Sequence, residues 1–181
     1  TDQMLDSPTN NFCTLNPLDK RSSFTLSEGN LKNTHFEDLW RICSSTFGVS
    51  SGKWYWEVYS GVQIDTMIGI MQDTLTPDTS SSSRTSTTDL WGLHNNGTKY
   101  GDNTSGSYSS AISAGDIIGI ELDMDNGTID FHINNSSQGE AFSGLSGTIM
   151  PMNRVYGGSP WNVFNFGQDS SFAGNKTAQG N

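Results

Sequence analysis

Residues 115–134 constrain the fold of this chain more than any other stretch, because they have the pattern of a complete β-hairpin. Apolar residues alternate with polar residues or glycine on both arms, and this period of two is typical of strands with one buried face. The alternating apolar residues are Ile118, Ile120, Leu122 and Met124 on the first arm and Ile129, Phe131 and Ile133 on the second. Between the arms, Asn126-Gly127 supplies the positive φ angles of a tight type I′ turn. The sequence therefore predicts that the chain folds back about Asn126 and buries the apolar face of the hairpin.

The rest of the chain favours strands as well. Its 181 residues include 20 glycines, and Ser, Thr and Asn are abundant while strong helix formers are scarce, which is typical of short strands joined by turns. Residues 53–59 are aromatic and β-branched on both faces, so we expect a strand in the middle of a sheet. We predict an all-β fold: a two-sheet antiparallel β-sandwich over residues 24–167, with an irregular lead-in at 1–23 and a polar tail or linker at 168–181.

Charge and hydropathy exclude two classes of partner. The formal net charge is −10, and nine Lys and Arg residues do not make the basic stripe that nucleic acid requires. No apolar run approaches the roughly 20 residues that span a bilayer, so membrane insertion is not expected.

The two cysteines, Cys13 and Cys43, are expected as reduced, packed thiols, although the sequence also allows a bridge if the fold brings them together.

The sequence offers no cofactor, metal or catalytic site. The acidic run at 123–127 resembles a calcium loop, but counting from Asp123 puts Thr128 at the position that needs glycine and Asn134 at the position that needs glutamate. No Gly-x-Ser-x-Gly nucleophile motif occurs, and His132 lies within a predicted strand on the wetter face. We therefore do not expect an enzyme, and we expect no cofactor and no bound metal.

Four segments, taken in order, resemble the SPRY domain family. They are SGKWYWEV at residues 51–58, IGI at 68–70, the GDIIG…LDMDNGTIDF stretch at 115–131, and VFNFG at 163–167. The resemblance implies a concanavalin-like, jelly-roll-like sandwich that acts as a non-catalytic interaction module. It also implies that partners are bound through long loops at one edge of the sandwich.

The lead-in LDSPTNNFCTLNP at residues 5–17, followed by the SPRY-like block, resembles structural proteins of bacteriophages. This second resemblance implies an exposed part of a virion, such as a tail or fibre. The expected partner is then a protein, either a host-surface receptor or a neighbouring virion subunit, and the chain is compatible with a homo-oligomer inside the virion. Two alternatives remain open: a lectin-like domain that binds glycans, and a structural piece buried between virion subunits.

Candidate contact residues are aromatic, histidine or arginine side chains on or beside predicted loops, since such residues dominate protein interfaces. Arg84 lies in a Ser/Thr-rich loop at residues 79–88, and the other candidates border shorter loops. The set is Arg84, Trp91, His94, Tyr100 and Trp161. In contrast, Trp54, Tyr55 and Trp56 lie within a predicted strand and are assigned mainly to packing.

Overall fold

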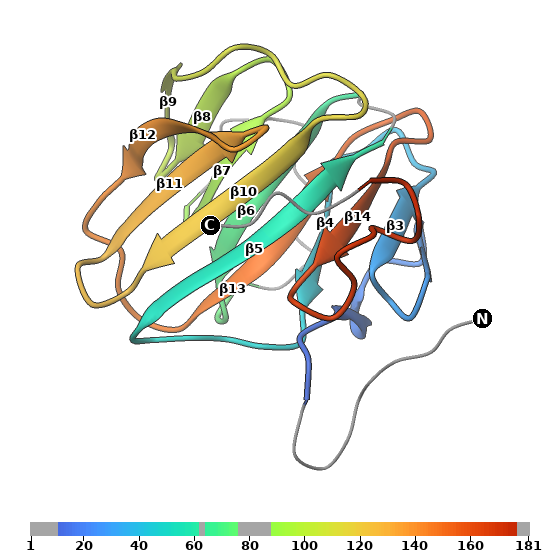
Figure 1. Cartoon of the computed structure of the whole chain (residues 1–181), viewed down its shortest axis with the longest axis horizontal. Coiled ribbons are helices and arrows are strands. Elements are labelled where there is room, and N and C mark those ends of the chain that lie inside the picture. Colours follow the sequence, from blue (N-terminus) through green and yellow to red (C-terminus); the bar gives the residue numbers. More distant parts are fainter. Residues whose placement is uncertain (1–10, 62–63, 76–87, 177–181) are drawn as a thin grey trace.

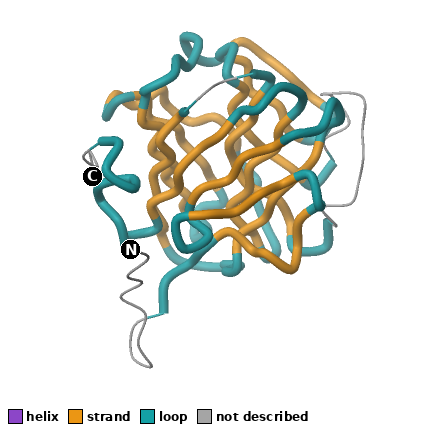
Figure 2. Tube along the Cα trace, turned by 90° about the vertical axis from the view of Figure 1, so that its right-hand side faces the viewer, coloured by secondary structure: helices purple, strands orange, loops and turns teal. Residues whose placement is uncertain are grey.

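The computed structural model describes residues 11–61, 64–75 and 88–176, and within these ranges all regular structure is β-strand (Figures 1 and 2). No described segment forms a helix that could span a membrane. The strands form two seven-stranded antiparallel sheets, which confirms the predicted two-sheet β-sandwich. In Figure 1, strands of the first sheet cross in front of strands of the second.

The two sheets are described by the spatial order of their strands. The first sheet consists of β12 (Ser136–Phe142), β11 (Thr128–Ile133), β10 (Ile117–Asp123), β5 (Lys53–Ser60), β14 (Trp161–Asn165), β3 (Lys32–His35) and β2 (Phe24–Ser27). The second sheet consists of β1 (Leu15–Lys20), β4 (Arg41–Ser45), β13 (Ile149–Val155), β6 (Thr66–Gln72), β7 (Leu90–His94), β8 (Thr98–Gly101) and β9 (Thr104–Ser107). The aromatic strand β5 has β10 on one side and β14 on the other, as its two-faced sequence predicts.

The predicted hairpin is the β10–β11 pair. Ile120 lies opposite Phe131 in the ladder, and both side chains are fully buried. Burial on this side follows from the alternation of the sequence, because a shift of one residue would turn every apolar side chain to the other face. The hairpin therefore contributes its apolar face to the core between the sheets.

The predicted type I′ turn is wrong, because four residues, 124–127, connect the two strands. Asp123 pairs with Thr128 across the hairpin, and in the loop Gly127 has a positive φ of 67° whereas Asn126 does not. The Asp123 carboxylate accepts the backbone N–H groups of Asp125 and Asn126, each at 3.0 Å. These side-chain bonds stabilise a wider loop of the kind built around a type I turn.

The core fills the space between the sheets and includes one polar link. Apolar residues of β5, β10, β11 and β14 meet those of β4, β6, β7 and β13. Within this layer Asn153 on β13 donates from Nδ2 to the Oδ1 atom of Asn33 on β3, at 3.1 Å. Because both side chains are buried, this hydrogen bond ties the two sheets together at a fixed position.

The packed domain extends beyond the predicted range of 24–167 at both ends. Strand β1 lies inside the segment expected to be irregular and pairs with β4. Pro17 is tolerated there because β1 is an edge strand, where a missing backbone N–H breaks no ladder. At the other end, Phe172 lies in the expected polar tail but is fully buried against Leu31, Ile117 and Val163.

Candidate binding hollow

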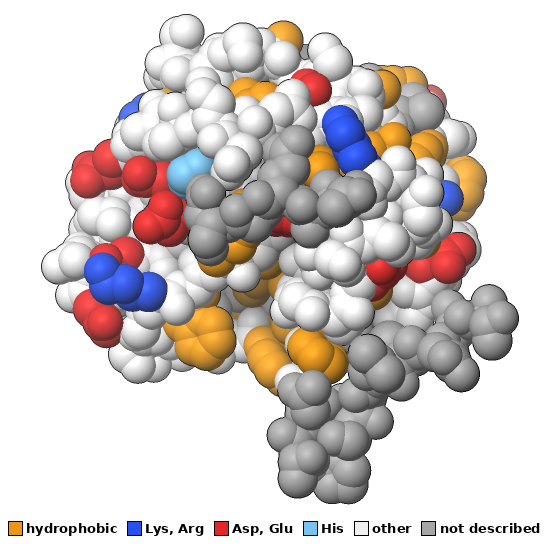
Figure 3. Space-filling model, in the orientation of Figure 1, with side chains coloured by type: hydrophobic (Ala, Val, Ile, Leu, Met, Phe, Trp, Pro, Cys, Tyr) orange, Lys and Arg blue, Asp and Glu red, His pale blue; other side chains and the backbone are white. Residues whose placement is uncertain are grey.

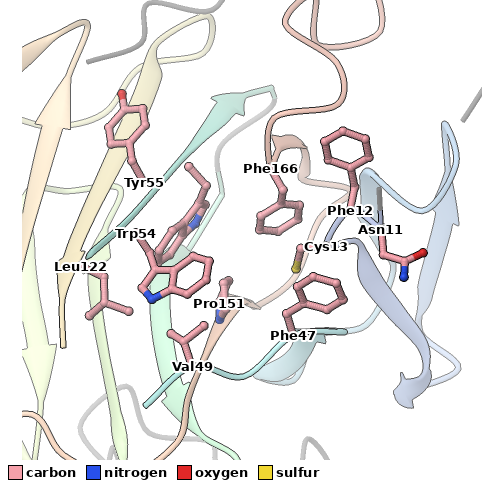
Figure 4. A pocket seen from close by; sticks show the side chains of 11 residues that line it. Asn11, Phe12, Cys13, Phe47, Val49, Trp54, Tyr55, Leu122, Pro151 and Phe166 are labelled. Carbon is pink, nitrogen blue, oxygen red and sulfur yellow. The ribbon is translucent and has the colours of Figure 1, made fainter. Parts of the chain in front are cut away.

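A hollow of about 190 Å³ opens at one end of the sandwich (Figure 4). Segments far apart in the sequence form its wall: the residues before β1, the β4–β5 loop, the start of β5, the end of β10, β13 and the residue after β14. Its lining consists of Asn11, Phe12, Cys13, Phe47, Val49, Trp54, Tyr55, Trp56, Leu122, Pro151 and Phe166. Hydrophobic side chains gather at the lower edge of the face drawn in Figure 3, where this hollow lies. The opening is thus mainly aromatic and aliphatic.

Side chains alternate between the two faces of β5, and this alternation places Trp54 and Trp56 on the same side of the strand. Trp56 is 4% exposed and belongs to the core, whereas Trp54, nearer the end of the strand, is 46% exposed. Trp54 pairs with Leu122 near the end of β10, and its Nε1 donates to the Ser51 carbonyl at 2.8 Å. The indole ring of Trp54 is therefore held in place while much of its surface remains open to solvent.

The β4–β5 loop holds Phe47 on another wall of the hollow. Val49 and Ile149 exchange two backbone hydrogen bonds of 2.8 Å each, which fix the loop to the start of β13. Ser45 also donates from its hydroxyl to the Phe47 carbonyl at 3.0 Å. Phe47 is 42% exposed although its backbone is anchored, so the aromatic surface is preformed rather than created on binding.

A hydrogen bond between two segments that are far apart in the sequence completes the wall of the hollow. Gln168 donates from Nε2 to the Cys13 carbonyl at 2.7 Å, and Phe166 stacks on Phe164 with ring centroids 5.6 Å apart.

Burial raises the pKa of the Cys13 thiol and raises that of Cys43 to about 12. Both cysteines are free and buried, as expected, and neither is the thiolate that a nucleophile requires.

The lining of the hollow carries no charged side chain, and the charges stand at its rim beside Trp54. Lys53 Nζ lies 2.8 Å from Asp123 Oδ2, and the Gly52 N–H donates to Asp125 Oδ1 at 2.7 Å. Hydrogen bonds from Lys53 and then Asn126 lower the pKa of Asp123 to about 2. The opposite charges of Lys53 and Asp123 neutralise each other, so the charge of Asp125 leaves the rim net negative. Within the described residues, no cluster of three or more His, Cys, Asp or Glu side chains is arranged to hold a metal ion.

The SPRY domain family model matches residues 53–169, a range that contains β5 to β14 and much of the wall of the hollow. The chain belongs to the SPRY domain family. SPRY domains are generally non-catalytic modules that bind proteins. The mainly aromatic and aliphatic lining of the hollow agrees with that role.

Known proteins share both the sequence and the fold of this SPRY domain. It is 32% identical over 131 residues to the ATP-dependent RNA helicase DDX1 of Xenopus laevis, covering 71% of this chain but only 17% of the helicase. The SPRY domain of human HERC1 superposes with a TM-score of 0.74 at 21% identity, covering 86% of this chain and 99% of that one. Stonustoxin gives a TM-score of 0.71 at 22% identity, over 85% of this chain and 27% of the toxin chain. The PSpry domain of TRIM65 gives a TM-score of 0.69 at 15% identity, covering 86% of this chain and 92% of that chain. These structures share the fold.

The structure buries three of the five residues predicted as contacts. Trp91, His94 and Tyr100 are each less than 10% exposed. Trp91 packs in the core between the sheets, Tyr100 packs in a second apolar cluster, and His94 Nε2 lies 3.4 Å from Asp65 Oδ1. Their positions beside loops suggested exposure, but Trp91 and His94 belong to β7, which is buried along its whole length, and Tyr100 lies in the buried half of β8.

The two remaining predicted contacts do not line the hollow either. Trp161 is half-buried at the opposite end of the sandwich from Trp54, because β14 runs antiparallel to β5. Its ring lies 4.3 Å from Lys32 Nζ and 5.9 Å from the ring of Tyr59. Arg84, with the rest of its loop up to residue 87, lies outside the described residues.

The sequence interpretation missed the aromatic residues that form the hollow. Trp54 was assigned to packing from its strand position, although it lies at the strand end and is half-exposed. Phe12, Phe47 and Phe166 lie outside the strands in polar or glycine-containing surroundings, and isolated aromatics of this kind were the available signal. Their convergence depends on the pairing of distant strands, which the local pattern does not reveal.

Proposed function

We propose that this SPRY domain is the protein-binding part of a phage virion protein and that the hollow receives an apolar side chain of the partner. The partner is a host-surface protein or a neighbouring virion subunit. The virion assignment is supported by the resemblance of residues 5–17 to phage structural proteins. Under this proposal the domain lies on an exposed part of the particle, such as a tail or fibre.

The observation that carries the proposal is the preformed aromatic opening. Trp54 and Phe47 expose 46% and 42% of their surface beside an uncharged hollow, while hydrogen bonds fix the backbone around them. Aromatic anchors that fill such pockets supply most of the free energy at many protein interfaces. A rigid opening also limits the conformational entropy lost on binding.

The same geometry favours a protein over a glycan. Aromatic rings stack on sugars, but sugar hydroxyls also need several hydrogen-bonding side chains, since unpaired hydroxyls are costly to desolvate. The side-chain amide and hydroxyl groups of the lining belong to Asn11 and Tyr55. The Tyr55 hydroxyl already donates to Glu57 Oε1 at 2.9 Å, and in Figure 4 Tyr55 points away from the other labelled side chains. The lectin-like alternative therefore has less support than protein binding.

A site-specific crosslink tests the proposal on intact particles. Phe47 is replaced by photoreactive benzoylphenylalanine, and the matched control carries the same group at Leu18, which is 94% exposed on the edge strand β1. We expect irradiation of purified phage, alone or adsorbed to host cells, to join position 47 to one defined protein, with little product from position 18. Equal products from both positions would contradict the role of the hollow, and absence of the chain from purified particles would contradict the virion assignment.

A further inference from the structure

The walls of the hollow have the aromatic chemistry that favours proline rings. Four aromatic side chains come from four separate segments and surround the space, and Pro151 lies among them (Figure 4). These aromatic residues are Phe12, Phe47, Trp54 and Phe166. Pyrrolidine rings pack flat against aromatic faces, and a proline-rich segment is already extended as a polyproline II helix before it binds.

Trp56 supplies a hydrogen-bond donor that no described residue uses. It belongs to the lining and is 4% exposed, and its buried Nε1–H has no acceptor among residues 11–61, 64–75 and 88–176. The indole of Trp54 differs, because its N–H is taken by the Ser51 carbonyl. A polyproline II segment has no internal hydrogen bonds and presents free backbone carbonyls, so it brings the acceptor that an isolated apolar side chain lacks.

The rim adds a preference for positive charge. Asp125 is exposed beside Trp54, and the nearby Lys53 is already paired with Asp123. The whole chain carries a formal net charge of −10. A basic side chain next to the docked segment would therefore meet a complementary potential.

From the aromatic walls, the unused indole donor and the acidic rim together, we infer that the hollow binds an extended, proline-rich segment with a basic residue beside its prolines. The inference rests on the proposed protein-binding function and names the chemistry of the partner. Trp54 and Phe47 stack on the proline rings, Trp56 donates to a backbone carbonyl, and Asp125 faces the basic side chain.

Charge argues against two other occupants of the same hollow. A second copy of this chain would bring another net charge of −10 to an acidic rim. The chain's own residues 1–10 contain two aspartates and no lysine or arginine. Both occupants are nevertheless separable from the proposed one by experiment.

Titration of the full chain with short peptides tests the inference. The probe is acetyl-Pro-Pro-Leu-Pro-Pro-Arg-amide, and its controls have glycine for every proline or glutamate for the arginine. We expect the indole N–H resonances of Trp54 and Trp56 to shift and saturate with the proline peptide. The glycine peptide should bind at least about tenfold more weakly, because it must be ordered on binding. The glutamate peptide should lose affinity severalfold at low salt.

Two variants locate the contacts. Trp54→Ala should weaken binding of the peptide by about tenfold or more, as expected for an aromatic anchor. Trp56→Phe keeps an aromatic ring but removes the donor, and should cost about fivefold, the effect of one hydrogen bond. Leu18→Ala is the control and should leave affinity unchanged, with unfolding curves confirming that all three variants are folded.

Several results would overturn the inference. These are equal affinity for the proline and glycine peptides, an unchanged affinity of Trp54→Ala, tighter binding of a peptide of residues 1–10 or of a glycan, and a concentration-dependent dimer that buries the indoles. If the crosslink from position 47 reaches a protein without a proline-rich segment, this inference fails while the protein-binding function stands. If position 47 crosslinks no protein yet the peptide binds, the proposed function fails while the chemistry of the hollow stands.

Discussion

At the scale of single residues, Trp54 and Trp56 show how position along one strand separates packing from recognition. The two indoles lie on the same side of β5, yet Trp56 is enclosed by the core while Trp54 stands at the strand end with its N–H fixed by Ser51. Burial of an aromatic ring stabilises the fold, whereas a fixed and exposed ring is available to a partner. The ring of Trp56 should therefore contribute mainly to the stability of the fold, with only its N–H available to a partner, whereas the ring of Trp54 should contribute mainly to affinity.

Alanine substitution of each tryptophan tests this division. Trp56→Ala should lower the free energy of unfolding by about 3–5 kcal/mol, the usual cost of emptying a buried aromatic site. Trp54→Ala should cost about 1–2 kcal/mol, because roughly half of the side chain is solvated in the folded state. Urea unfolding at equilibrium measures both. Equal losses would show that Trp54 is as much a core residue as Trp56.

His35 should make stability depend on pH in the mildly acidic range. It is fully buried against Phe24, with ring centroids 4.8 Å apart, and burial lowers its pKa from the usual 6.5. Because the unfolded chain binds the proton more readily, this contribution is complete above about pH 6.5 and is lost as the pH falls through the lowered pKa. Unfolding curves between pH 7 and pH 5 should show the loss, and His35→Leu should remove it. An identical pH slope in the variant would assign the effect to other groups.

At the scale of elements, short-range patterns determine the strands but not the way distant loops meet. The alternation in residues 115–134 predicted the pairing of β10 and β11 and the burial of Phe131. The turn type was missed because the Asp123 side chain bonds the loop backbone and stabilises four residues instead of two. The hollow was missed because Phe12, Phe47 and Phe166 converge only after strands far apart in the sequence have paired.

The connection between β10 and β11 should be sensitive to a single methyl group. An added Cβ at Gly127 would lie 2.6 Å from the Leu145 carbonyl oxygen, and the φ of 67° already disfavours any side chain. Gly139 is the matched control, since its φ is 83° but no atom lies within 4 Å of an added Cβ. We expect Gly139→Ala to cost about 1–2 kcal/mol for the backbone alone, and Gly127→Ala to cost clearly more in thermal unfolding. Equal costs would mean that the loop moves freely away from Leu145.

At the scale of the whole molecule, packing extends past the region that carries the family pattern. The SPRY match spans residues 53–169, whereas β1 begins at Leu15 and the buried Phe172 follows the match. No periodic pattern surrounds Phe172 in the sequence, because its neighbours are serine, alanine, glycine and asparagine. Its burial comes from contact with Leu31, just before β3, and with residues of β10 and β14, and only the three-dimensional arrangement reveals it.

Removal of the Phe172 side chain tests whether the last segment is part of the domain. Phe172→Ala should lower the free energy of unfolding by about 3–5 kcal/mol, because the ring is fully buried. Leu18→Ala changes an apolar side chain that is 94% exposed, and should cost no more than about 0.5 kcal/mol. A Phe172→Ala protein as stable as Leu18→Ala would instead mark residues 168–176 as a tail.

The most direct test of binding at the hollow uses the five tryptophans of the chain as reporters. The protein is labelled with 5-fluorotryptophan, and its ¹⁹F spectrum is followed during titration with the protein that crosslinks to position 47. The signals of Trp54 and Trp56 should shift to saturation, while those of Trp91 in the core and Trp161 at the opposite end stay in place. A shift confined to Trp161 would move the binding surface to the other end of the sandwich and contradict the role assigned to the hollow.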